Sequence, residues 1–116
     1  MSQALNGRFA YEPVRTIAAA SVGASYSAIG GPLLNPARQF FIQNLTDQTV
    51  MISFDGINDA FPLPSNGNII DDIAANYTHQ SNWFMAQGTT VYVKRIGTPT
   101  TGSVYVSIFY ASGINV

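Results

Sequence analysis

The 116-residue sequence contains no cysteine. This absence excludes disulfide bonds, thiolate nucleophiles, and zinc or iron–sulfur sites held by cysteine. Charged residues are also scarce, at 9% of the chain against roughly 25% in an ordinary globular domain. The surface must therefore consist largely of uncharged polar and apolar side chains, which suits a protein that is buried against partners or against copies of itself.

The net charge of −1 gives the chain no long-range field that would attract nucleic acid or an anionic membrane. The charged residues are nevertheless segregated by sign. Those in the first third are mainly basic, and those in residues 47–72 are all aspartates. The two regions could meet head to tail between subunits, or they could be ordinary solvated loop charges. We expect no nucleic-acid partner, no membrane partner, no cofactor, no metal and no small-molecule ligand.

Export and membrane signals are also missing. The first residues lack the basic start and apolar run of a signal peptide, so we expect synthesis in the cytoplasm. Residues 16–37 carry no charge and are long enough to cross a bilayer. We reject a membrane span there because serines, glycines and a proline interrupt the stretch and its apolar residues are mainly alanine.

What the sequence does contain is alternation. From about residue 39 onward apolar and polar residues alternate, and no twelve-residue window shows a helical stripe with capping signals. Clear strands are predicted at 39–43, 49–54, 89–96 and 103–110. Their inward side chains are predicted to be Phe40, Ile42, Val50, Ile52, Phe54, Val91, Val93, Val104, Val106, Ile108 and Tyr110. The last two strands are predicted to pair as an antiparallel hairpin across the turn-rich loop 97–102.

Shorter strand candidates lie at 14–20, 25–29, 61–63, 68–73 and 83–85. About eight short strands separated by turn signals predict an all-β fold, a two-sheet antiparallel β-sandwich that is jelly-roll-like. A single domain is predicted over residues 14–116. Residues 1–13 have no turn-bounded strand pattern and are predicted to form an extended N-terminal arm.

Residues capable of chemistry are few. His79 is the only histidine, so a Ser–His–Asp arrangement would depend on it, and no serine lies in a Gly-x-Ser-x-Gly motif. Asp71 and Asp72 are neighbours on a predicted strand and would point to opposite faces. Asp55 and Asp59 flank a turn whose oxygen-bearing side chains Ca²⁺ could use, but Asx turns are the usual role of such residues. We predict that the protein is not an enzyme.

Outward-facing aromatics are the remaining functional candidates. On the predicted strands these side chains would lie on the sheet face that points away from the core. A patch of this kind is either a protein contact, a second buried sheet face or a sugar-binding platform. Together with residues of the N-terminal segment they make up the predicted protein interface, which consists of Arg8, Phe9, Tyr11, Arg15, Tyr92, Tyr105 and Phe109.

The C-terminal half resembles the small virion structural proteins of tailed bacteriophages, in particular jelly-roll cement or decoration proteins. The segments that carry the resemblance are FDG at 54–56, FPLP at 61–64, GTTVYVK at 88–94 and GSVYVSIFYA at 102–111. It implies a virion location, a role in stabilising the capsid lattice, contact with the major capsid protein or other virion proteins, and homo-oligomers. Head–tail, collar and tail-fibre adaptor proteins look similar, and a carbohydrate-binding β-sandwich is a further alternative.

Overall fold

The structure, a computed structural model, describes residues 8–72 and 85–112. Its elements are β1 (Arg8–Ala18), the 3-10 helix η2 (Ala19–Ser21), β2 (Ser27–Ala28), β3 (Gln39–Asn44), β4 (Val50–Ser53), β5 (Phe61–Leu63), β6 (Asn68–Asp72), β7 (Tyr92–Arg95) and β8 (Ser103–Ser112). The predicted all-β class is confirmed. None of the described residues belongs to a helix with the length and apolar character needed to span a bilayer.

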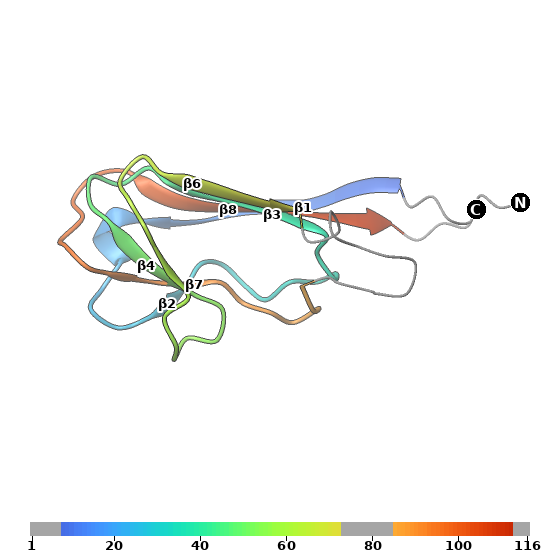
Figure 1. The fold of residues 1–116 in the computed structure, drawn as a ribbon, viewed down its shortest axis with the longest axis horizontal. Helices are drawn as coiled ribbons and strands as arrows, with labels where there is room; N and C mark the ends of the chain where they lie inside the picture. Colours follow the sequence, from blue (N-terminus) through green and yellow to red (C-terminus); the bar gives the residue numbers. More distant parts are fainter. Residues whose placement is uncertain (1–7, 73–84, 113–116) are drawn as a thin grey trace, which may run out of the picture.

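The eight strands of the described ranges form two four-stranded antiparallel sheets, which lie as two layers in Figure 1. Sheet A has the order β1-β8-β3-β6, and sheet B has the order β2-β7-β4-β5. Strands whose numbers add to nine lie side by side, namely β1 with β8, β2 with β7, β3 with β6 and β4 with β5. This is the order of a long hairpin wound into two sheets, so the predicted jelly-roll-like sandwich is confirmed.

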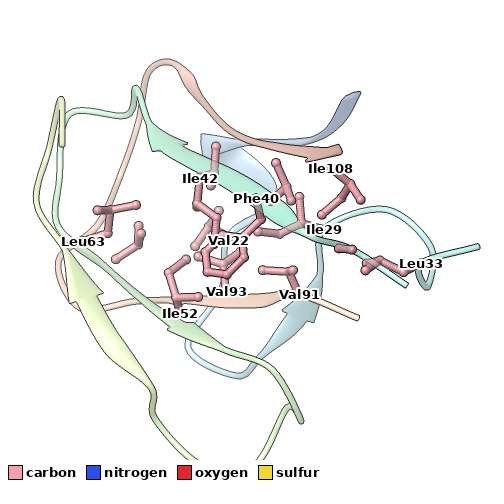
Figure 2. Close-up of a cluster of buried hydrophobic side chains, with 14 residues drawn as sticks. Val22, Ile29, Leu33, Phe40, Ile42, Ile52, Leu63, Val91, Val93 and Ile108 are labelled. Carbon is pink, nitrogen blue, oxygen red and sulfur yellow. The ribbon is translucent and has the colours of Figure 1, made fainter. Parts of the chain in front are cut away.

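The core lies between the two sheets (Figure 2). Sheet A contributes Phe40 and Ile42 from β3 and Val104, Val106 and Ile108 from β8, all of them buried as predicted. The opposite layer contributes Val50, Ile52, Leu63, Val91 and Val93. Each such side chain stabilises the fold by roughly 1.5–3 kcal/mol relative to leaving it exposed. Alternation in the sequence therefore located the core because one face of every long strand is buried.

The predicted hairpin between 89–96 and 103–110 is wrong. Strand β7 pairs with β4 and β2 in sheet B, whereas β8 pairs with β1 and β3 in sheet A. A strand with one buried face shows the same alternation whether the next strand lies beside it or faces it across the core. The local pattern therefore could not distinguish pairing from facing.

The connection 96–102 crosses from one layer to the other. Asp47 holds it by accepting hydrogen bonds from the Thr100 amide at 2.8 Å and from the Thr100 hydroxyl at 2.7 Å. Gly102 has φ +85°, and a Cβ on it would lie 1.9 Å from the Leu45 carbonyl oxygen. Only glycine fits this crossing, because it needs both the left-handed backbone and the missing side chain.

The N-terminal segment also differs from the prediction. Strand β1 begins at Arg8, so the predicted end of the arm at Pro13 falls inside a strand of sheet A, and residues 1–7 lie outside the described residues. The register between β1 and β8 shifts between Glu12 and Arg15. A bulge at this point accommodates Pro13, which cannot donate a ladder hydrogen bond, and lets the strand continue.

Among the short strands, the prediction at 61–63 matches β5, and the one at 68–73 matches β6 to within one residue. The candidate at 25–29 shrinks to the two residues of β2. Of the candidate at 83–85 only Met85 lies within the described residues, where it forms an isolated bridge with Ala37.

Candidate protein-binding face

Sheet A has one face on the core and one face turned away from sheet B. Directly opposed residues of antiparallel strands point to the same side, so the register fixes which side chains share the outer face. They are Phe9, Tyr11 and Thr16 from β1, Tyr105, Ser107 and Phe109 from β8, Gln39, Phe41 and Gln43 from β3, and Asn68 and Ile70 from β6. We call this set the sheet A face.

Three of the predicted interface residues meet at one corner of the sheet A face. Phe9 stacks on Phe109 with 5.6 Å between ring centroids and 28° between ring planes. Tyr11 lies opposite Phe109 in the register and 6.3 Å from the Phe9 ring. Phe9 is 72% exposed and Tyr11 is 67% exposed. Exposed aromatic rings on a paired strand are typical of a contact surface, because each ring buries a large area and has few rotatable bonds to order.

The apolar character continues across the sheet. Phe41 on β3 is directly opposite Ile70 on β6, and Ile70 is 66% exposed. None of the described side chains of this set carries a charge, although the register also places Asp72 of β6 opposite Gln39 at one end of the sheet. An outer sheet face that is solvated normally carries polar and charged residues in alternation with the core positions. Away from Asp72, removing the sheet A face from water therefore requires no desolvation of ions, which favours burial against another protein.

Phe41 and Ile70 were not among the predicted interface residues. The structure has Phe41 half-exposed. Ile70 follows Ile69, and two adjacent isoleucines do not indicate which one faces the core. Its orientation comes from the register, in which Ile69 lies opposite buried Ile42. Strand pairing across the sheet was the missing signal.

Arg15 does not belong to this surface, contrary to the prediction. Its side chain is 10% exposed and forms an ion pair with Glu12, at 2.6 Å between Nη2 and Oε1. Nε and Nη2 also donate to the Gly31 and Pro32 carbonyls at 2.9 and 3.0 Å. The alternation of the sequence could not predict the burial of Arg15, because the bulge around Pro13 turns both Glu12 and Arg15 toward the sandwich interior.

Glu12 anchors the loop that follows β2 to the edge strand of sheet A. Its carboxylate accepts hydrogen bonds from the Leu34 amide at 3.1 Å, the Asn35 amide at 2.8 Å and the Asn35 side chain at 3.0 Å. Burial raises the pKa of Glu12, but the hydrogen bonds from Arg15 and Asn35 and the charge of Arg15 outweigh burial and leave the pKa below its usual value. The ion pair is structural, since it closes the sandwich edge.

Tyr92 lies on the other sheet, so it does not join the predicted aromatic group. In β7 it is opposite Ser53 of β4 and Ala28 of β2, on the outer side of sheet B. Its ring packs on Gly56, where a Cβ would lie 3.2 Å from Tyr92 Cε2. Tyr105 is on the sheet A face as expected, and the side chain of Arg8 lies outside the described part of the structure.

The turn after β4 folds over sheet B. The Asp55 carboxylate accepts from the Ile57 and Asn58 amides, both at 2.8 Å, and these backbone hydrogen bonds hold its pKa well below the usual range. Ser53 is buried beneath the turn and its hydroxyl oxygen accepts from the Gly56 amide at 3.0 Å. The Asx-turn interpretation of this segment is therefore confirmed.

A polar cluster continues the cover on sheet B. The Tyr26 hydroxyl donates to Asp59, whose Oδ1 is 3.2 Å from Lys94 Nζ, and the same ammonium lies 4.7 Å from the centre of the Tyr26 ring. Burial, and then the hydrogen bond and charge of Asp59, raise the pKa of Tyr26 to about 12. These groups satisfy one another, so the chain itself covers part of the outer side of sheet B above β7.

The remaining chemical candidates form no site within the described ranges. No group of three or more His, Asp or Glu side chains there could hold a metal ion. His79 lies outside the described residues, as do the side chains of Asp71 and Asp72, whose backbone belongs to β6.

Comparisons with known protein families, with curated proteins and with solved structures found no match. The candidate site therefore rests on its geometry and chemistry.

Proposed function

We propose that this chain is a non-enzymatic structural protein of a virion, a cement or decoration protein that stabilises the capsid lattice through protein–protein contacts. The observation that carries the proposal is the sheet A face, an aromatic-rich sheet surface whose described side chains carry no charge, left open beside a sheet B that its own turn residues partly cover. The jelly-roll architecture supports it, because this fold is common in capsid proteins.

The physics of a repeated lattice suits such a face. An apolar surface without charge gains from burial at low desolvation cost but gives little long-range steering. That is sufficient when many copies bind symmetry-related sites, because avidity adds up modest contacts. A rigid sheet also loses less conformational entropy on docking than a loop would. The proposed partner is the major capsid protein or another protein of the virion.

Two isoleucines provide a matched test. Ile70 is 66% exposed on the sheet A face, and Ile57 is 80% exposed on the turn that covers sheet B. Particles purified from the source culture and stripped of the chain are rebound with wild type, Ile70→Lys or Ile57→Lys, and their thermal disruption is followed by light scattering. We expect Ile70→Lys to lose rebinding and the thermal protection, and Ile57→Lys to behave as wild type. Equal rebinding by Ile70→Lys and wild type would refute the proposed face.

An adaptor of the head–tail junction, collar or tail fibre would use the same face in few copies per particle. Quantitative gels of purified particles separate the two functions, since a cement protein is present in numbers comparable to the coat subunits. A chain present in only a few copies would favour the adaptor.

A carbohydrate-binding function is favoured by one observation, the exposed rings of Phe9 and Tyr11, because aromatic faces stack on sugars and jelly rolls include lectin domains. A glycan array would test it. Binding at about millimolar Kd or tighter that is lost in Tyr11→Ala and in Tyr105→Ala would support this function over capsid contact.

A further inference from the structure

The four sheet edges of the sandwich differ in how well they are protected. Edge β2 has two residues, and edge β5 has three with Pro62 at the centre. Edge β6 has five residues. Edge β1 has eleven residues and, among the described residues, pairs only with β8. Short edges and edge prolines prevent strands of other molecules from pairing, and the N-terminal part of β1 has neither protection.

The start of β1 also projects beyond the rest of the sheet. Strand β3 begins at Gln39, opposite Phe109, whereas β1 and β8 remain paired as far as Arg8 and Ser112. In Figure 1 these two strands run past the other strands toward the chain termini. A two-stranded ribbon is marginally stable in water, so its backbone edge and the exposed rings that it carries gain from a further strand.

The sequence Arg8-Phe9-Ala10-Tyr11-Glu12 is complementary to itself when two copies run antiparallel with Ala10 opposite Ala10. Phe9 then lies opposite Tyr11 of the second copy, and Tyr11 opposite its Phe9. Both residues point to the sheet A face, so four aromatic side chains meet on one side of the joint. Aromatic cross-strand pairs stabilise sheets, and this register doubles the aromatic corner already seen between Phe9 and Phe109.

Backbone chemistry favours the same register. Arg8 stands opposite Glu12 of the second copy, so no like charges face each other, and the Glu12 carboxylate itself stays engaged by Arg15 within its own sandwich. Moving the joint one residue pair toward Pro13 would place a proline, which has no amide hydrogen, opposite Phe9. Moving it the other way would place Tyr11 opposite Gly7 in place of an aromatic ring. The bulge after Glu12 ends the regular edge, which limits the joint to five residues.

From these observations we infer that two copies of this chain associate through residues 8–12 of β1, antiparallel about a two-fold axis at Ala10. The two sheets A become one eight-stranded sheet, and both sheet A faces lie on the same side of it. Such isologous pairing closes on itself and leaves no second long edge to extend into a fibre. The inference is independent of the proposed capsid function, since it needs only the chain itself.

Site-directed cross-linking tests the register, because the protein has no cysteine of its own. Opposed Cα atoms in an antiparallel pair are about 4.5–5.5 Å apart, a span that a disulfide bridges. Ala10→Cys is incubated with oxidised glutathione, which accepts the electrons of the two thiols, and compared with Val14→Cys. Val14 is 57% exposed on the same strand and has no two-fold counterpart nearby in this register.

We expect Ala10→Cys to form a covalent dimer at least about tenfold faster than Val14→Cys, because paired thiols meet at a millimolar effective concentration. Equal rates for the two variants would overturn the register.

Sedimentation of the unmodified chain provides the second readout. Wild type is expected to sediment as a dimer, and Tyr11→Lys as a monomer with an unchanged far-UV spectrum, because a lysine on an edge strand opposes pairing. A wild type that is monomeric at about 100 μM would contradict the inference, because a dimer with a dissociation constant well above that concentration would not be populated enough to cross-link. Ile70→Lys, which lies on β6 at the far edge of sheet A, is expected to remain dimeric. Because Ile70→Lys is expected to lose capsid rebinding and to stay dimeric, failure of the capsid proposal and failure of the dimer proposal give different results.

Discussion

The outer sides of the two sheets have opposite characters although both sheets share one core. On sheet B, the turn after β4 covers Ser53 and Gly56 lies against Tyr92, while Tyr26, Asp59 and Lys94 close a polar cluster above β7. On sheet A, no described loop crosses the outer side of the strands in a comparable way, and Phe9, Tyr11 and Ile70 are each more than 60% exposed.

This contrast shows that an exposed apolar face is not a necessary by-product of the jelly roll. Sheet B has short strands, and the turn that follows β4 lies against their outer side. Sheet A has the two longest strands, and their outward positions hold aromatic and uncharged polar residues in place of charged ones. An open apolar face of this kind is typical of a contact surface, which agrees with the proposed function.

The largest effect on this contrast is expected from Glu12→Gln, which releases the edge of sheet A from the loop after β2. The substitution leaves Arg15 buried without its counter-ion, so the free energy of unfolding should fall by about 3 kcal/mol. Urea unfolding followed by circular dichroism measures the change. In the double variant Glu12→Gln/Arg15→Met most of the loss should be recovered, because no buried charge remains. A single variant as stable as wild type would show that the ion pair does not hold the edge.

The second prediction concerns the pH dependence of the same contact. The pKa of Glu12 is lowered in the folded protein, so its contribution is fully present above its unfolded pKa of 4.5 and is lost as the pH falls through the folded pKa. The exposed carboxylates Asp47, Asp55 and Asp59 have lowered pKa values as well. They remain in Glu12→Gln, so the stability difference between wild type and this variant isolates Glu12. We expect that difference to shrink between pH 5 and pH 2, and a constant difference would contradict the assignment.

The aromatic corner of the sheet A face should produce a smaller effect. A double-mutant cycle with Phe9→Ser and Phe109→Ser is expected to give a coupling free energy of about 0.5–1.5 kcal/mol, the usual contribution of a stacked aromatic pair. Chemical unfolding of the four proteins measures it. Additive losses would mean that the rings do not stack in solution.

The smallest effect is expected on sheet B. Tyr26→Phe removes one hydroxyl from the exposed polar cluster and should leave the unfolding midpoint nearly unchanged. Absorbance titration at 295 nm should lose the tyrosine that ionises near pH 12. Stability that depends on Tyr26 would otherwise be lost between pH 10 and pH 12, because a raised pKa favours the folded state only while the phenol keeps its proton. A clear destabilisation of Tyr26→Phe at neutral pH would contradict this prediction and show that the cluster stabilises the fold.

Much of the fold was predictable from alternation alone. Phe40, Ile42, Val104, Val106 and Ile108 lie in the core because period two reports which face of a strand is buried. Sheet pairing was not predictable, since β7 and β8 would show the same alternation side by side or face to face.

The candidate site was predictable only in part. One face of sheet A carries Phe9, Tyr11, Tyr105 and Phe109, as predicted. Arg15 is buried by a bulge, whose only signal in the sequence is Pro13. Tyr92 belongs to the other sheet. Phe41 and Ile70 complete the face through cross-strand register, which links residues far apart in the chain.

Hydroxyl-radical footprinting tests the central claim most directly, because it measures the exposure of individual side chains in the free chain and in purified particles. The informative residues are Phe41, Tyr105 and Ile70, which lie on the sheet A face away from residues 8–12 of β1. The account predicts that these three are protected in particles relative to the free chain, while Ile57 and Tyr26 over sheet B remain reactive. Protection of the sheet B residues with Phe41 and Ile70 still reactive would contradict it.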